Sequence, residues 1–211
     1  MEDCFNLIHS LANSYSDSLT KKMSGRLVEM ESDDNSHYLI YRVLGISLKE
    51  GKMIDEYQNK GRFLYKYAGS FLEEASILCF ESAFPEAKKK VRIPNTIGMR
   101  PKTFEIDCLI NNDAYEIKWR DATTDGDHIV KEHTRIKNIK DAGYNPIRIM
   151  FYYPNRSQAI KIQEALQAIY KSVGGEYYFG KLAWEIIKER TGIDLLNILE
   201  RIAHEKNTGS S

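Results

Sequence analysis

Two adjacent segments with alternating apolar and polar side chains constrain the fold of this chain most strongly. Residues 103–110 read Thr-Phe-Glu-Ile-Asp-Cys-Leu-Ile, and residues 113–119 read Asp-Ala-Tyr-Glu-Ile-Lys-Trp. Both segments alternate with the period of two that half-buried strands show. Asn111 and Asn112 lie between them, and Asn tolerates the positive φ that a type I′ hairpin turn requires. The sequence therefore predicts a β-hairpin over residues 103–119.

The register of this hairpin decides which polar side chains meet. With the two asparagines as the loop, counting back along both strands places Asp107 opposite Glu116. Their Cβ atoms would then lie roughly 4.5–5.5 Å apart on one face, with Lys118 one pleat further along. A loop one residue longer would send the two carboxylates to opposite faces of the sheet.

Two carboxylates that face each other on neighbouring strands repel. A divalent cation between them removes the conflict, and carboxylate oxygens are ligands that suit Mg²⁺. A lysine beside the pair can orient a water molecule and stabilise developing negative charge. We therefore interpret Asp107, Glu116 and Lys118 as a metal-dependent phosphodiesterase site. The alternative is a charged strand face that only contacts solvent, so the order of the surrounding elements has to decide.

Size and composition are those of an ordinary globular protein. A chain of 211 residues can bury a core, and 42% hydrophobic and 28% charged residues are typical values. Thirty basic and thirty acidic residues give a net charge of zero. This balance does not favour a non-specific nucleic-acid binder, although a local basic patch beside acidic metal ligands would give the same total.

The three cysteines, Cys4, Cys79 and Cys108, are isolated and lie in apolar contexts. Buried thiols in a reducing compartment explain them better than a disulfide or a zinc site. No apolar run approaches the length of a membrane span, and the start of the chain lacks the basic residues of a signal peptide. We expect a cytoplasmic protein with no membrane partner.

Before the hairpin, helical periodicity dominates. It predicts a helix over residues 3–22 and a long helix over residues 51–84, broken near Gly61 and stopped by Pro85. Residues 37–44 suit either a strand or a short helix. Glu73 and Glu74 lie midway along the long helix, and either of them points at the metal site or both lie on an exposed face. We expect residues 1–60 to form an accessory layer, a dimer surface or a DNA-contacting arm.

A short strand around residues 91–93 precedes the hairpin, and a helix over residues 128–142 follows it, with Asp127 as its expected cap. The run 147–153 is the best candidate for a fully buried strand. Further helices are predicted at residues 158–172, 181–190 and 193–205. The core domain would then span residues 61–206, and residues 207–211 would form a flexible tail.

Several polar side chains near the hairpin are candidates for contacts with DNA. The segment 86–102 carries a local excess of basic residues that suits phosphates, or else is a solvated linker. One face of the helix 128–142, which we expect to be its outer face, carries polar side chains that could contact bases or backbone. The candidates are Lys102, Arg120, Asp125, Asp127, His128, Lys131, Arg135 and Asn138.

From residue 65 to residue 153 the predicted order is helix, strand, strand, strand, helix, strand, with an Asp on the second strand and Glu-x-Lys on the third. This resembles the core of the PD-(D/E)XK nucleases, an α/β (α+β) fold with a mixed sheet flanked by helices. On this resemblance, Asp107, Glu116 and Lys118 match the motif, and Ile106 stands where the motif name has Pro. The family often adds an acid from the first helix, for which Glu73 or Glu74 is the candidate.

Longer phrases are similar to the ApaLI-like type II restriction endonucleases: residues 116–128, residues 146–154, and Gly-Gly-Glu-Tyr-Tyr at 174–178. The resemblance implies that Asp107 and Glu116, with the backbone carbonyl of Ile117, hold Mg²⁺. It also implies cleavage of double-stranded DNA at a short palindrome by a homodimer, with a cognate DNA methyltransferase in the same system. The alternatives are a structure-specific repair or junction nuclease of this fold, a catalytically inactive DNA-binding protein, and a protein without a nucleic-acid partner.

Overall fold

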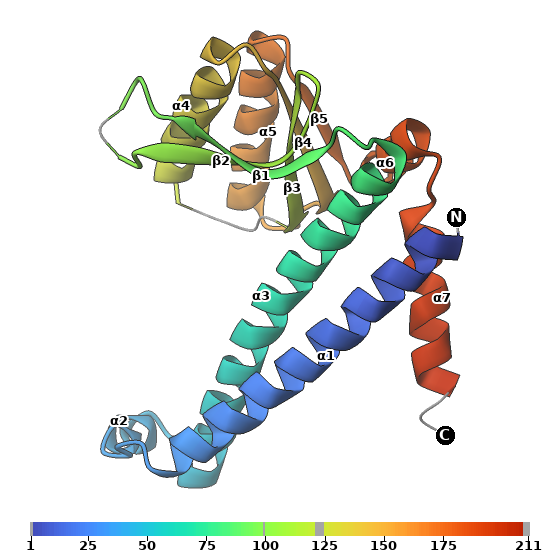
Figure 1. Ribbon diagram of the computed structural model, residues 1–211. Helices are drawn as coiled ribbons and strands as arrows, with labels where there is room; N and C mark the ends of the chain where they lie inside the picture. The colour runs from blue at the N-terminus through green and yellow to red at the C-terminus, as the bar shows by residue number, and fades with distance from the viewer. Residues whose placement is uncertain (1, 99, 121–124, 209–211) are drawn as a thin grey trace. The chain divides into compact units, whose positions relative to one another are not determined.

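A computed structural model describes residues 2–98, 100–120 and 125–208 (Figure 1). Within these ranges the chain forms seven helices and one five-stranded mixed sheet, which confirms the α/β class. The elements are, in order, α1 (Glu2–Glu31), α2 (Tyr38–Val43), α3 (Leu48–Ala83), β1 (Lys88–Pro94), β2 (Thr103–Ile110), β3 (Asp113–Arg120), α4 (Asp127–Asp141), β4 (Asn145–Tyr152), α5 (Ser157–Ser172), β5 (Glu176–Phe179), α6 (Lys181–Thr191) and α7 (Leu195–Thr208).

The chain divides into two compact units. The helical unit is Ser10–Phe71 and contains most of α1, all of α2 and the first two thirds of α3. The sheet unit comprises Met1–His9 and Leu72–Ser211. The division therefore falls inside two helices. None of the helices within the described ranges is both long enough and apolar enough to cross a bilayer.

The first and third helices are longer than the sequence periodicity indicates. α1 continues past residue 22 to Glu31, and α3 runs through Gly61 without interruption. The expected break at Gly61 is therefore wrong. A glycine inside a helix costs only about 1 kcal/mol relative to alanine, and the long helix-forming segments on both sides outweigh that cost. The segment that suited either a strand or a short helix is the helix α2.

The strands follow one another in the order β1-β2-β3-β4-β5. The pairs β1–β2 and β2–β3 are antiparallel, whereas β3–β4 and β4–β5 are parallel. The sequence predicted the first four strands but not β5. That strand has four residues, all of them half-buried, so it lacks the alternation that revealed the hairpin.

The β2–β3 hairpin has the predicted register, with Ile110 opposite Asp113. The predicted type I′ turn is wrong, because it requires a positive φ at both central residues and only Asn111 has one, at 51°. Backbone pairing of the two strands ends at Cys108 and Tyr115. Beyond this point the Asp107 side chain of β2 accepts a hydrogen bond from the backbone N–H of Ile117 on β3.

Helices cover both faces of the sheet. Tyr115 of β3 packs against Phe80 of α3, with ring centroids 4.5 Å apart. Its neighbour Glu116 contacts Arg135 of α4 on the opposite face. Figure 1 shows α4 and α5 side by side on that face. A polar side chain of β3 that points to this face is therefore covered by α4.

The three cysteines are free and buried, as expected. A hydrogen bond with Cys79 lowers the pKa of the Cys4 thiol to about 6, whereas burial raises the pKa of Cys108 to about 12. All three therefore serve as core side chains of the sheet unit.

Candidate active site

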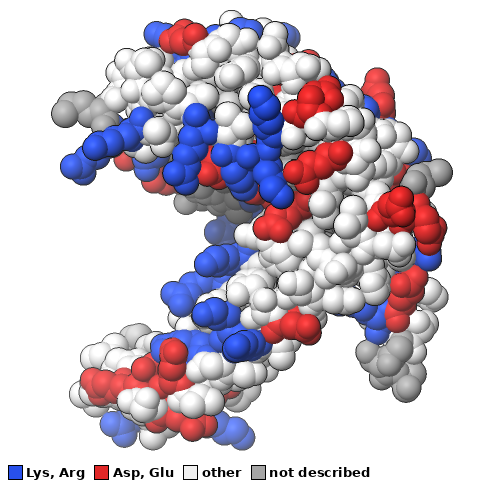
Figure 2. All heavy atoms as spheres, in the orientation of Figure 1, with Lys and Arg blue, Asp and Glu red and all other residues white. Residues whose placement is uncertain are grey.

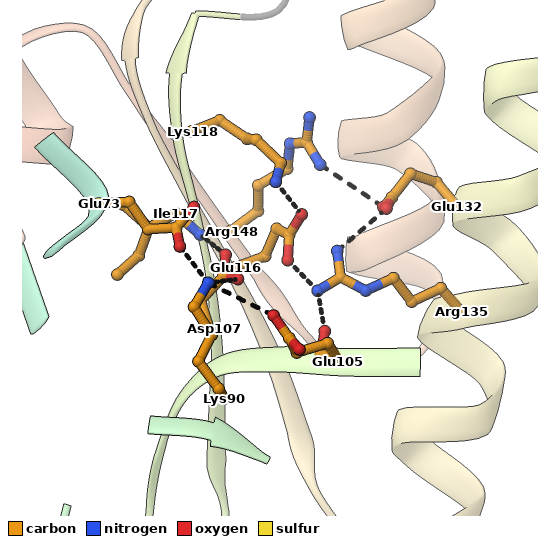
Figure 3. Close-up of polar contacts among 10 residues, drawn as sticks. All are labelled: Glu73, Lys90, Glu105, Asp107, Glu116, Ile117, Lys118, Glu132, Arg135 and Arg148. Atoms are coloured by element: carbon orange, nitrogen blue, oxygen red, sulfur yellow. Dashed lines mark hydrogen bonds and ion pairs between the residues drawn. The ribbon is translucent and has the colours of Figure 1, made fainter. Parts of the chain in front are cut away.

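Asp107 lies on β2 where this strand separates from β3, and it is only 5% exposed. Its Oδ2 accepts a hydrogen bond of 2.9 Å from the backbone N–H of Ile117 on β3. Its Oδ1 lies 3.2 Å from the ammonium nitrogen of Lys90 on β1 (Figure 3). The carboxylate thus joins the two strands at the point where their backbone hydrogen bonds end.

Glu116 follows on β3 and is 4% exposed. The Nζ atom of Lys118, two residues along the same strand face, lies 2.6 Å from its Oε1. The guanidinium of Arg135 on α4 donates to its Oε2. The structure therefore brings the three residues of the predicted motif together, with both Glu116 oxygens held by cations (Figure 3). The Lys118 side chain is 36% exposed, so solvent reaches the site at Lys118.

A second group of carboxylates surrounds the ammonium of Lys90. This nitrogen contacts Glu73 of α3 and lies 3.4 Å from Oε1 of Glu105 in addition to its contact with Asp107. Of the two candidate acids on the long helix, the structure brings Glu73 to the site and leaves Glu74 exposed. Burial, and next the negative charge of Asp107, raises the pKa of the Glu73 carboxyl.

On the α4 side, a chain of buried charges supports Glu116. Arg135 donates to the backbone carbonyl of Glu105 at 2.7 Å and to Glu132 at 3.2 Å. The other Glu132 oxygen lies 3.5 Å from the guanidinium of Arg148, which is fully buried on β4. Burial lowers the pKa of Arg135, and the surrounding acceptors stabilise its charge. These buried charges on α4 and β4 fix the position of the Glu116 carboxylate.

The expectation of an outer face on α4 is wrong for Arg135 and Asn138, which are 8% and 2% exposed. The Asn138 amide oxygen accepts a hydrogen bond of 2.7 Å from the Thr96 N–H. The helix itself is present as predicted. Long polar side chains can nevertheless point inward when buried hydrogen-bond partners satisfy them. Of the other candidates for DNA contact, His128 is partly exposed. The remaining ones are exposed: Lys102, Arg120, Asp125, Asp127 and Lys131.

The start of α4 also differs from the prediction. Gly126 precedes the helix, and Asp127 is its first residue rather than its cap. The Asp127 N–H donates to Oδ1 of Asp125 at 3.0 Å. Asp125 therefore accepts a hydrogen bond from a backbone N–H that has no partner within the helix. Residues 121–124, which lie between β3 and Asp125, are outside the described residues.

Sequence reasoning missed four residues of the site. Glu105 could have been found, because it lies two residues before Asp107 on the same strand face. Lys90 could not, since the register between β1 and β2 depends on the long connection between them. Glu132 and Arg148 carry no local signal, because their pairing joins α4 to β4.

The carboxylates of the site are candidate ligands for a divalent cation. Among the described residues, no three His, Cys, Asp or Glu side chains are arranged as metal ligands. The physical reason is that their oxygens face Lys90, Lys118 and Arg135. The chemistry of the site nevertheless fits Mg²⁺, because carboxylate oxygens of Glu73, Glu105 and Asp107 converge on one positive charge, the Lys90 ammonium. Asp107, Glu116 and Glu73 are the side chains that could hold the ion.

Comparison with known proteins identifies the family of this chain. The family model described as ApaLI-like restriction endonuclease matches residues 1–204. Neither the curated proteins nor the solved structures include a significant match to this chain.

Proposed function

Because this chain belongs to the ApaLI-like restriction endonuclease family, we propose that it is a type II enzyme acting on duplex DNA. It hydrolyses phosphodiester bonds at a short palindromic sequence and requires Mg²⁺. The observation that carries this proposal is the meeting of Asp107, Glu116 and Lys118 where β2 and β3 separate. Two acids and a lysine at this position of the sheet can serve metal-dependent phosphodiester hydrolysis.

In the proposed mechanism, Asp107 and Glu116 hold the cation together with the backbone carbonyl of Ile117, and Glu73 is the additional acid. When bound, the cation supplies Lewis-acid stabilisation of the charge on the phosphoryl oxygens. The hydrogen bond from the Ile117 N–H orients the Asp107 carboxylate. Arg135 holds one Glu116 oxygen and leaves the other directed at Lys118. The acids are therefore preorganised before DNA arrives.

Lys118 acts on the reacting phosphate. Its ammonium orients the attacking water or offsets the negative charge that develops at phosphorus. Water attacks in line, the bond from phosphorus to the 3′ oxygen breaks, and the products carry a 5′-phosphate and a 3′-hydroxyl. The partial exposure of Lys118 supports this role, because the phosphate has to approach from solvent.

The exposed candidates supply the DNA contacts. Figure 2 shows Lys and Arg side chains gathered over β1 and β2 in the sheet unit. The exposed Lys102 and Arg120 are the candidates for phosphate contacts, and Lys131, Asp125 and Asp127 near the start of α4 are the candidates for base contacts in the major groove. The half-buried His128 belongs to the same candidates.

The two-fold symmetry of a palindromic site matches two active sites related by a two-fold axis, so we propose a homodimer. Exposed apolar side chains of the helical unit support a protein partner. Leu39, Ile40, Val43 and Leu44 at α2 are each more than half exposed, and contiguous apolar patches mark interaction surfaces. Sedimentation velocity should give twice the chain mass, and Val43→Glu should give the monomer.

The test of the catalytic assignment is Lys118→Ala, with Lys137→Ala on the exposed side of α4 as the matched loss of charge. In Mg²⁺, Lys118→Ala should lose cleavage of plasmid DNA while retaining DNA affinity in Ca²⁺, and the control should cut normally. Cleavage by Lys118→Ala near the parental rate would refute the assignment.

Digestion of long DNA by the parental chain distinguishes a site-specific enzyme from the alternative functions. Discrete fragments with a common end sequence support a site-specific enzyme, whereas branch-dependent cutting favours a structure-specific nuclease. Binding without metal-dependent nicking favours an inactive DNA-binding protein. If methylation of the cleaved sequence protects the DNA from digestion, this would support the expected cognate methyltransferase.

A further inference from the structure

Lys90 has an unusual position in the sheet. Backbone pairing of β1 with β2 joins Lys89 to Cys108 and Val91 to Ile106, but skips the position between them, where Lys90 faces Asp107. The φ angle of Lys90 is 55°, in the left-handed region that residues other than glycine seldom adopt. Such a backbone conformation is kept where the surroundings compensate for it, and these positions cluster at functional sites.

The compensation for Lys90 is electrostatic. Its ammonium contacts three carboxylates from two elements: Glu73 of α3, and Glu105 and Asp107 of β2. The ammonium donates hydrogen bonds to Glu73 and Asp107 and forms an ion pair with Glu105. Burial lowers the pKa of Lys90, but the hydrogen bond to Glu73 and the charge of Asp107 raise it by more, so its net pKa lies above the ordinary value. The Lys90 ammonium is therefore held among carboxylates of α3 and β2.

The charge balance of the cluster suits an exchange of cations. Three carboxylates carry three negative charges. The ammonium reduces the net charge to minus two, and a divalent cation in its place would reduce it further, to minus one. The Lys90 side chain is 41% exposed, and its flexible four-carbon stem can move the ammonium into solvent. Lys118 differs, because its ammonium is paired with Glu116, which does not belong to this cluster.

We propose that Lys90 is a built-in competitor of the divalent cation: its ammonium occupies two of the proposed metal ligands, Asp107 and Glu73, until the metal displaces it. The residue holds Glu73, Glu105 and Asp107 together in the metal-free protein and lowers the affinity of the site for metal. Lys90 is a positioning residue and does not contact the scissile phosphate. This inference rests on the proposed metal-dependent function.

The test compares Lys90→Met with Lys89→Met. The control removes the same charge from the neighbouring residue of the same strand, whose ammonium is paired with Glu81 at 3.7 Å. Ca²⁺ binding to the full chain without DNA is measured by isothermal titration calorimetry. Removing a charge-assisted hydrogen-bond cluster that competes with the metal should tighten Ca²⁺ binding about tenfold or more in Lys90→Met. Lys89→Met should stay within about twofold, since its ion pair is exposed.

A thermal readout separates competition from general damage. Metal-free Lys90→Met should melt at a lower temperature than the parental chain, because its three carboxylates repel, and Ca²⁺ should restore more of that loss than it adds to the parental chain. Lys90→Arg retains the positive charge and should restore the weaker, parental Ca²⁺ affinity. Lys90→Gln provides a second neutral variant and should match Lys90→Met.

Unchanged or weaker Ca²⁺ affinity in both neutral variants, with the Lys89→Met control unchanged, would overturn the proposal. So would loss of folding, seen by circular dichroism, that Ca²⁺ does not reverse in either neutral variant. The proposed function fails separately, if the parental chain itself neither binds a divalent cation nor cuts DNA in its presence.

Discussion

The substitution Arg135→Met tests the buried charges behind the site. Methionine retains most of the apolar stem of arginine, but it removes the guanidinium that serves Glu116, Glu132 and the Glu105 carbonyl. The two carboxylates are 4% and 6% exposed, so water cannot replace the lost donor. Breaking a buried ion pair from one side costs about 3–5 kcal/mol. Domains have a total stability of about 5–15 kcal/mol, so the loss should be a large part of it.

Equilibrium urea denaturation followed by circular dichroism measures the free energy of unfolding. The control Lys131→Met removes an exposed charge from the same helix and should change it by less than about 0.5 kcal/mol. Arg135→Lys should fall between the two, because it keeps the charge without the planar fork that reaches several acceptors. A loss below about 1 kcal/mol in Arg135→Met would show that Glu116 does not depend on Arg135.

Three further substitutions test the fold. Gly61→Ala should raise the free energy of unfolding by about 0.5–1 kcal/mol in urea denaturation, because the position is helical and its Cβ meets no atom within 4 Å; a destabilised variant would contradict the continuous α3. Gly175→Ala should lower the melting temperature, because its Cβ would lie 2.5 Å from the carbonyl oxygen of Pro146; an unchanged melt would refute the close approach of these backbones. A hydrogen bond to Asp55 raises the pKa of His37 above its ordinary 6.5, so the stabilisation is complete below that value and is lost as the pH rises through the raised pKa. The melting-temperature difference between the parental chain and His37→Asn should therefore shrink from pH 6 to pH 8, and a constant difference would exclude this pair.

The hairpin and its motif could be predicted because their determinants are local. Alternation with period two assigns each side chain to a face, and a two-residue loop sets the register within the same seventeen residues. The order of helices and strands around the hairpin was accessible for the same reason. Helix ends were less accessible: the cost of Gly61 is small beside the stabilisation of a long helix, so a local breaker did not end α3.

What only the tertiary structure decided is which charges surround the two acids. The positions of Lys90 and Glu73 depend on how β1 and α3 meet β2, and the inward direction of Arg135 depends on Glu116 and Glu132 as buried partners. A polar residue on a helix has the same pattern in the sequence whether it contacts solvent or a buried carboxylate. The burial of a charge depends on partners that are distant in sequence, and only the folded chain brings these partners together.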